Sequence, residues 1–221
     1  KKDYKKIGAN IKLVPNAGKD ILPKLTVLQD LVKQKKSYDY VFLLHDKKSP
    51  EYDRAMRSEW MDTWRQDLSS LLFDKALREQ CFFALRYYSQ IGILGHLKHL
   101  KYGPGWHRKL YGHRRYLNEC KLLDYQNQIK KYLNIVNVKN GANDLIFKEE
   151  QAWFVGGTMF WMRWEVIKLF MTTYKIAPLL RALRLDKGNV KDPSLTHACE
   201  RFFGQMASGA NKKVIGYGED I

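Results

Sequence analysis

Cysteine is scarce in this sequence. The 221 residues contain three cysteines, Cys81, Cys120 and Cys199, and none of them belongs to a Cys-x-x-Cys pair. Their separation argues against a disulfide framework and against a zinc site built from thiolates. A reducing, cytoplasmic setting fits this cysteine content best.

A long uninterrupted apolar run is also missing. The most apolar long stretch, residues 152–170, contains Arg163, Glu165 and Lys168, whereas a membrane-spanning helix needs about 20 mostly apolar residues. No positively charged start is followed by the short apolar segment of a secretory signal peptide. We therefore expect no transmembrane segment.

Acidic residues are outnumbered by basic ones. The sequence has 23 Asp and Glu against 39 Lys and Arg, which gives a formal net charge of +16. This excess favours polyanionic partners, namely nucleic acid, an anionic membrane surface or phosphorylated small molecules. Because the basic residues are dispersed along the chain, the alternative is that the charge only keeps the protein soluble.

Hydrophobic periodicity predicts strands that alternate with helices. The expected strands are residues 11–14, 38–44, 91–95 and 153–162, and the expected helices are residues 21–33, 60–72, 77–85, 117–133, 164–174 and 194–207. Polar loops and turns are expected at residues 98–115, 138–144 and 186–193. The pattern predicts an α/β fold for one domain over residues 1–221, with an open, mostly parallel sheet whose ligands bind beyond the carboxyl ends of the strands.

The first polar cluster, residues 16–20, follows the first expected strand and has the sequence Asn-Ala-Gly-Lys-Asp. It precedes a helix, so backbone N–H groups, the helix dipole and Lys19 could face an anion. The alternative is an ordinary turn in which Asp20 caps the helix.

The second polar cluster follows the expected strand 38–44. It joins a metal-ligand pair, His45 and Asp46, to the ammonium groups of Lys47 and Lys48. Such charges could stabilise the diphosphate that leaves when a sugar is cleaved from a nucleotide. The alternative is that the lysines are only solvated.

Two further groups of residues could contribute to a site. In the final helix, His197, Glu200, Arg201 and Gly204 lie opposite the apolar face. They could contact a metal or a phosphate, or form a solvated outer face. Upstream, residues 149–150 are two glutamates that could supply a general base, or be exposed acids.

Together these segments resemble the rhamnan synthesis protein F family. The resemblance rests on five short motifs in the same order: N-x-G-(R/K)-D at residues 16–20, Y-D-Y-V-x-x-L-H-x-K-K-S at 38–49, W-R-x-D-L at 64–68, G-T-M-F-W at 157–161 and H-A-x-E-R at 197–201. Five ordered motifs over most of the chain are far more specific than any one of them.

The resemblance implies a glycosyltransferase of the GT-A type, assisted by a divalent cation such as Mn²⁺ or Mg²⁺. The implied partners are a UDP-, GDP- or dTDP-sugar donor and a glycan or lipid-linked glycan acceptor. The positive charge adds a peripheral membrane contact to the predicted partners, and nucleic acid is disfavoured. The implied donor-binding residues are Asn16, Gly18, Lys19, Asp20, His45, Lys47, Lys48, Arg65, Gly156, Gly157, Thr158, Trp161, Glu200 and Arg201. The predicted metal ligands are Asp46 and His197, and the predicted catalytic residues are Asp46, Glu149 and Glu150.

The sequence departs from the family pattern in two respects. Asp46 stands where a threonine or similar residue is expected, and no D-x-D pair follows the strand. A GT-A domain also opens with about two βα units before the region that resembles residues 11–14, so we expect an N-terminally incomplete domain.

Two other classes of function stay open on the sequence alone. A nucleic-acid-binding module is suggested by the net charge and by the basic, aromatic segment 106–115. A non-catalytic scaffold domain of a glycan-assembly protein would keep the fold without turnover.

Overall fold

The computed structural model describes residues 10–15, 17–45, 59–102, 124–125, 127–133, 153–186 and 194–218, with the backbone alone described at 59–62 and 102. Along the chain the elements are α2 (Ile21–Lys33), β1 (Tyr40–Leu43), α3 (Glu59–Phe73), α4 (Lys75–Tyr87), β2 (Ile91–His96), the 3-10 helix η2 (Leu97–His99), β3 (Leu100–Tyr102), β4 (Trp153–Val155), β5 (Phe160–Arg163), α6 (Trp164–Thr173), α7 (Ala177–Leu185), α8 (Leu195–Gly209) and β6 (Lys213–Tyr217).

The main sheet is mixed. Its strand order is β1-β5-β2-β6, and β3 and β4 form a separate two-stranded antiparallel sheet. Strand β5 runs antiparallel to both of its neighbours, whereas β2 and β6 are parallel. The expectation of a mostly parallel sheet is therefore wrong for the pairing, although β1, β2 and β6 all point in the same direction.

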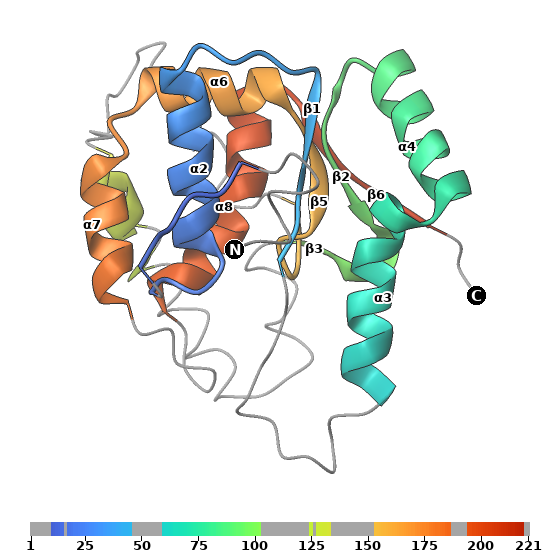
Figure 1. The fold of residues 1–221 in the computed structure, drawn as a ribbon, viewed down its shortest axis with the longest axis horizontal. Helices are drawn as coiled ribbons and strands as arrows, with labels where there is room; N and C mark the ends of the chain where they lie inside the picture. Colours follow the sequence, from blue (N-terminus) through green and yellow to red (C-terminus); the bar gives the residue numbers. More distant parts are fainter. Residues whose placement is uncertain are drawn as a thin grey trace.

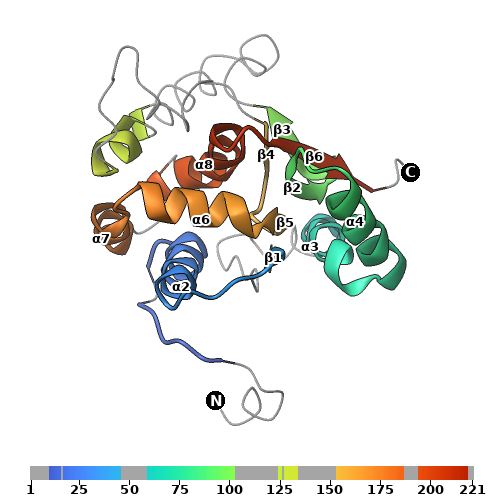
Figure 2. The same ribbon diagram turned by 90° about the horizontal axis from the view of Figure 1, so that it is seen from above.

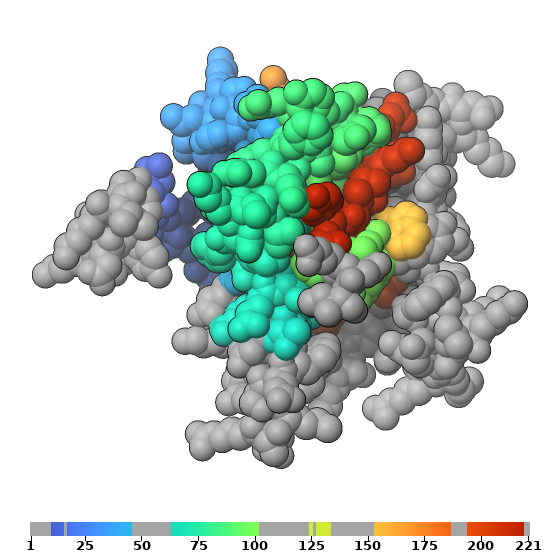
Figure 3. All heavy atoms as spheres, turned by 90° about the vertical axis from the view of Figure 1, so that its right-hand side faces the viewer, coloured from blue at the N-terminus to red at the C-terminus, as the bar shows by residue number. Residues whose placement is uncertain are grey.

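Helices cover both faces of the main sheet (Figures 1 and 2). Helices α3 and α4 lie on one face, and α6 and α8 lie on the other, with α2 and α7 packed outside them. The larger core lies between the sheet and α6 and α8, where Phe160 meets Phe203 edge-on and Phe170 meets Phe202 in the same way. In Figure 3 strand β6 is visible beside α3 and α4 on the surface.

Helix α8 is enclosed on more than one side. Its residues Leu195, Cys199, Phe202 and Met206 face the core as expected, but Gly204 is buried as well. A Cβ atom at Gly204 would lie 2.0 Å from the carbonyl oxygen of Trp153 in β4. The side of the helix that includes Gly204 is therefore covered by β4, and the alternative of a solvated outer face is wrong at this position.

Most of the expected elements are present. Helices α2, α3, α4, α6 and α8 and strands β1 and β2 occur where periodicity predicts them, and residues 124–125 and 127–132 are helical within the expected helix 117–133. The expected strand 153–162 is two strands, β4 and β5, which belong to different sheets. The expected loop 98–115 begins with η2 and β3, and α7 and β6 were not predicted.

Residues 11–14 do not form a strand. They pair with no strand of the described chain, and the Leu13 side chain is 73% exposed. An extended segment without a partner leaves its backbone groups to water, so an apolar sequence alone does not make it a strand. The expected turn at 138–144 lies outside the described residues.

Within the described ranges, no helix has both the length and the apolar character needed to cross a membrane. Cys81 and Cys199 are buried free thiols. Burial raises the pKa of Cys81 to about 12 and raises the pKa of Cys199. These two cysteines therefore contribute to the core as small apolar groups.

Candidate functional site at the carboxyl edge of the sheet

Several chain segments meet at one edge of the main sheet. Because β1, β2 and β6 point in the same direction, their carboxyl ends lie at this edge, and the reversed strand β5 begins there. His45 follows β1, Thr158 precedes β5, and His96 ends β2. We call this region the carboxyl edge.

A buried charge pair lies where α2 meets the carboxyl edge. The Lys24 ammonium donates to Asp20 Oδ2 at 2.6 Å, to the Thr158 carbonyl oxygen at 2.7 Å and to Thr158 Oγ1 at 2.9 Å. Thr158 Oγ1 also hydrogen-bonds Asp20 Oδ2, and His45 Nδ1 lies 3.4 Å from the same oxygen. Asp20 therefore joins the start of α2, the end of β1 and the turn before β5.

Asp20 occupies the N-cap position of α2, yet its side chain makes no capping hydrogen bond. Burial by itself would raise the pKa of Asp20, but the charges of Lys24 and His45 outweigh burial, and the pKa lies below its ordinary value. Burial lowers the pKa of Lys24, against the opposing charges of Asp20 and Glu200. Asp20 is thus a carboxylate that anchors Lys24.

A second set of hydrogen-bonded polar residues lies around the first turns of α8. The Glu200 carboxylate accepts a hydrogen bond from the Gly157 N–H, and Asp186 Oδ2 accepts from Thr196 N at 2.7 Å and from Thr196 Oγ1 at 2.5 Å. His197 Nδ1 lies 3.1 Å from Ser194 Oγ. Burial, followed by the positive charge of Lys19, lowers the pKa of His197, which favours the neutral imidazole.

At Gly157 the turn between β4 and β5 approaches helix α3 closely. Its backbone φ is +94°, a value that residues with a side chain rarely adopt. A Cβ atom at this position would lie 2.4 Å from the Trp64 ring and 2.6 Å from Leu68. The preceding residue, Gly156, donates its N–H to the His99 carbonyl oxygen at 2.9 Å. Helix α3 and the segment after β2 thus fix the turn between β4 and β5.

The structure brings many of the predicted residues together. Asp20, His45, Gly157, Thr158 and Glu200 are linked as described, and Lys19 is close enough for its charge to act on His197. Gly18 is tied to this region by its N–H, which donates to the Asp186 carbonyl oxygen.

Other predicted residues lie elsewhere. The Trp161 indole is buried between Phe42 and Phe82 and donates to the Leu71 carbonyl oxygen at 2.9 Å. Arg65 is exposed on α3, and the Arg201 guanidinium lies over the Phe154 ring. Asn16, Asp46, Lys47, Lys48, Glu149 and Glu150 lie outside the described residues, as does the basic segment 106–115.

Sequence reasoning missed Lys24 and a group formed by Asp67, His96 and His99. Lys24 follows Asp20 by four residues on an otherwise apolar helix face, and that spacing alone indicates a pair. The predicted strand 91–95 stops before His96 and the predicted loop 98–115 contains His99, so the two histidines were not predicted as a pair, although two histidines three residues apart after a buried strand are a recognisable ligand spacing.

Comparison with known protein families decides the classification. A family model described as rhamnan synthesis protein F matches residues 2–212. The chain belongs to the rhamnan synthesis protein F family. The family is involved in the synthesis of rhamnan, a polysaccharide. No curated protein and no solved structure matches the chain.

The divalent cation expected from the family resemblance is only partly matched by the described residues. His197 offers a neutral imidazole, but the nearby carboxylates of Asp186 and Glu200 already accept backbone N–H groups. Mg²⁺ and Mn²⁺ prefer several oxygen ligands. The cation at Asp46 and His197 accordingly stays a prediction.

Proposed function

We propose that this member of the rhamnan synthesis protein F family is a glycosyltransferase. It moves a sugar from a UDP-, GDP- or dTDP-sugar to a glycan or lipid-linked glycan acceptor, within a GT-A-like domain. The observation that carries the proposal is that parts of all five family motifs adjoin the carboxyl edge. Open α/β sheets bind their ligands at this edge.

The charges at the carboxyl edge support a donor that carries phosphates. Helices α2 and α8 both begin here, so the positive ends of two helix dipoles face the same region. Lys19 is exposed at the start of α2 and adds a full positive charge. A departing nucleoside diphosphate gains negative charge, and fixed positive groups stabilise that charge without reorganising.

Asp20 and Glu200 act in this proposal as positioning residues. Each carboxylate is occupied by partners within the protein, namely Lys24 and Thr158 for Asp20 and the Gly157 N–H for Glu200. They hold the turn 156–158 against the starts of α2 and α8. The activating base stays assigned to Glu149 or Glu150, and a cation held by Asp46 would supply charge neutralisation at the phosphates.

The experiment follows the release of nucleoside diphosphate from UDP-, GDP- and dTDP-sugars, with and without Mn²⁺ or Mg²⁺ and with glycan acceptors. We expect release with one base class and an increase when acceptor is present. Glu200→Ala should lower kcat/KM by about tenfold or more, because the turn loses its anchor. Glu200→Gln should restore most of that loss, because its amide oxygen accepts the same N–H.

A non-catalytic scaffold is the second candidate, because Asp20, Lys24 and Glu200 are all satisfied within the protein. A scaffold needs such pairs only for stability. If a protein that unfolds cooperatively released no nucleoside diphosphate with any donor and acceptor, this second candidate would be favoured over glycosyl transfer.

A further inference from the structure

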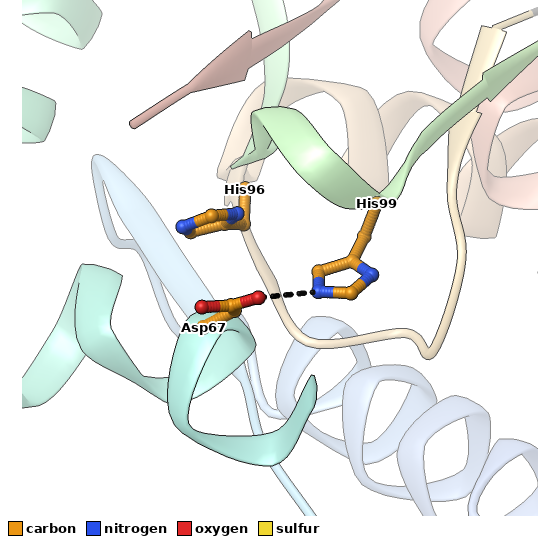
Figure 4. A group of neighbouring side chains, drawn as sticks. All are labelled: Asp67, His96 and His99. Atoms are coloured by element: carbon orange, nitrogen blue, oxygen red, sulfur yellow. Dashed lines mark hydrogen bonds and ion pairs between the residues drawn. The ribbon is translucent and has the colours of Figure 1, made fainter. Parts of the chain in front are cut away.

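Three side chains converge at the carboxyl end of β2, beside the turn 156–158. Asp67 comes from α3, His96 ends β2 and His99 ends η2, and Figure 4 shows the three pointing toward one another. The ligand atoms of these residues all lie within 4.8 Å of one another. The Asp67 and His99 side chains are 18% and 12% exposed, and the His96 residue as a whole is 6% exposed.

One nitrogen atom in this cluster lacks a hydrogen-bond partner. His96 Nδ1 is buried and makes no hydrogen bond to any described residue. The other edge of the ring faces Gly218, where a Cβ atom would lie 3.1 Å from His96 Nε2. A buried polar atom without a hydrogen-bond partner is unfavourable. An ion bound at this nitrogen would supply the missing partner.

The spacing suits a metal ion as well as a hydrogen bond. His99 Nε2 lies 3.2 Å from Asp67 Oδ2. Two ligand atoms on one tetrahedral ion, each about 2.0–2.1 Å from it, are about 3.3 Å apart. Two imidazoles and one carboxylate suit zinc and its first-row neighbours better than Mg²⁺ or Ca²⁺, which prefer oxygen ligands.

We propose that Asp67, His96 and His99 bind one divalent first-row transition-metal ion. The ion would join α3 to the end of β2 through three protein ligands and leave a fourth position open. It would also steady the carboxyl edge, because the His99 carbonyl oxygen accepts from Gly156 and the His99 ring meets Trp64 edge-on. This site is separate from Asp46 and His197, and it does not depend on glycosyl transfer.

The test is a titration of the tag-free, metal-stripped protein with Co²⁺, read by visible absorption and by metal content after gel filtration. We expect one tightly held Co²⁺ with the d–d bands of a low-coordinate site. Changing a direct ligand should cost more than the 10- to 100-fold in affinity that outer-shell changes cost. His96→Gln, His99→Gln and Asp67→Asn should each show such a loss, and Zn²⁺ should displace the Co²⁺.

His197→Gln is the matched control, since it removes a partly buried histidine at the same edge but outside this group. It should keep the ion. Failure of the unchanged protein to hold stoichiometric Co²⁺ would overturn the proposal, as would binding that survives all three ligand variants. Loss of the same bands in His197→Gln alone would move the ion to the other site. Circular dichroism of each metal-free variant shows whether it is folded, and Asp67→Asn, the most exposed position, serves if a histidine variant is not.

Discussion

At the scale of single residues, the Asp20–Lys24 pair shows how a charge is kept inside the protein. The Lys24 side chain is 7% exposed, and its ammonium has three oxygen acceptors. The pair therefore satisfies itself by hydrogen bonds rather than by water. Removing one partner leaves the other charge buried without compensation, which costs more than the pair contributes.

Asp20→Asn should lower the free energy of unfolding by about 3 kcal/mol, because Lys24 loses its carboxylate. Urea unfolding at pH 7 measures the change. Asp30→Asn is the matched control, since Asp30 lies on the same helix but pairs with Lys12 at the surface. An exposed pair contributes only about 0–1 kcal/mol, so equal losses in the two variants would contradict this account.

The same pair predicts a dependence on pH. The pKa of Asp20 is lower in the folded protein than its ordinary value, so its stabilising effect is complete above the unfolded pKa of about 3.9. The effect is lost as the pH falls through the lower, folded pKa. The difference in unfolding free energy between the unchanged protein and Asp20→Asn should therefore persist from pH 7 down to pH 5 and shrink below pH 4.

At the scale of elements, α8 can pack closely against β4 because residue 204 is a glycine and has no side chain. Helix α8 has its core face against α6 and the main sheet, and β4 crosses it at Gly204. Replacing a helical glycine by alanine normally gains about 1 kcal/mol in helix propensity. Here the added Cβ would overlap a backbone oxygen, which cannot move aside as a side-chain end can.

Gly204→Ala should therefore destabilise the protein by about 2–3 kcal/mol, since overpacking exceeds the gain in propensity. Thermal or urea unfolding gives the value. Ser208→Ala, one turn further along α8 and only partly buried, should change the stability by less than about 1 kcal/mol. A Gly204→Ala protein that is more stable than the unchanged one would show that β4 does not pack here.

The elements that could be predicted are those whose own sequence decides them. Helix α2 has Ile21, Leu22, Leu25 and Leu28 on one buried face, and β2 is buried throughout. The direction of β5 could not be predicted, because an apolar strand sequence is compatible with both parallel and antiparallel pairing. Strand β6 alternates weakly and depends on β2 for its pairing, so its formation is a property of the sheet.

The site was predictable to a similar degree. The motifs identified Asp20, His45, Thr158 and Glu200, whose contacts link residues up to 138 positions apart. Their roles were less accessible, since the sequence does not show that Asp20 bonds Lys24 instead of capping α2. The His96 and His99 spacing is visible in the sequence, but Asp67 joins the two histidines only when α3 packs on β2, so the complete group could not be predicted.

At the scale of the whole molecule, the fold decides which of the basic residues behind the net charge of +16 lie near the carboxyl edge. Lys19 lies at the carboxyl edge, at the start of α2, whereas Lys36 lies just beyond the other end of the same helix. Helix α2 has 13 residues, so the two lysines are about 20 Å apart along it. They carry the same charge, but only Lys19 is placed to meet a phosphate at the carboxyl edge.

The most direct measurement is calorimetric titration of UDP, GDP and dTDP into the unchanged protein, Lys19→Gln and Lys36→Gln. We expect one nucleoside diphosphate to bind the unchanged protein and Lys36→Gln alike. Lys19→Gln should bind it about tenfold more weakly, the effect of losing one charge-assisted contact. Equal weakening in both variants would mean that only net charge matters, and the absence of binding to the unchanged protein would contradict a nucleotide-sugar site at the carboxyl edge.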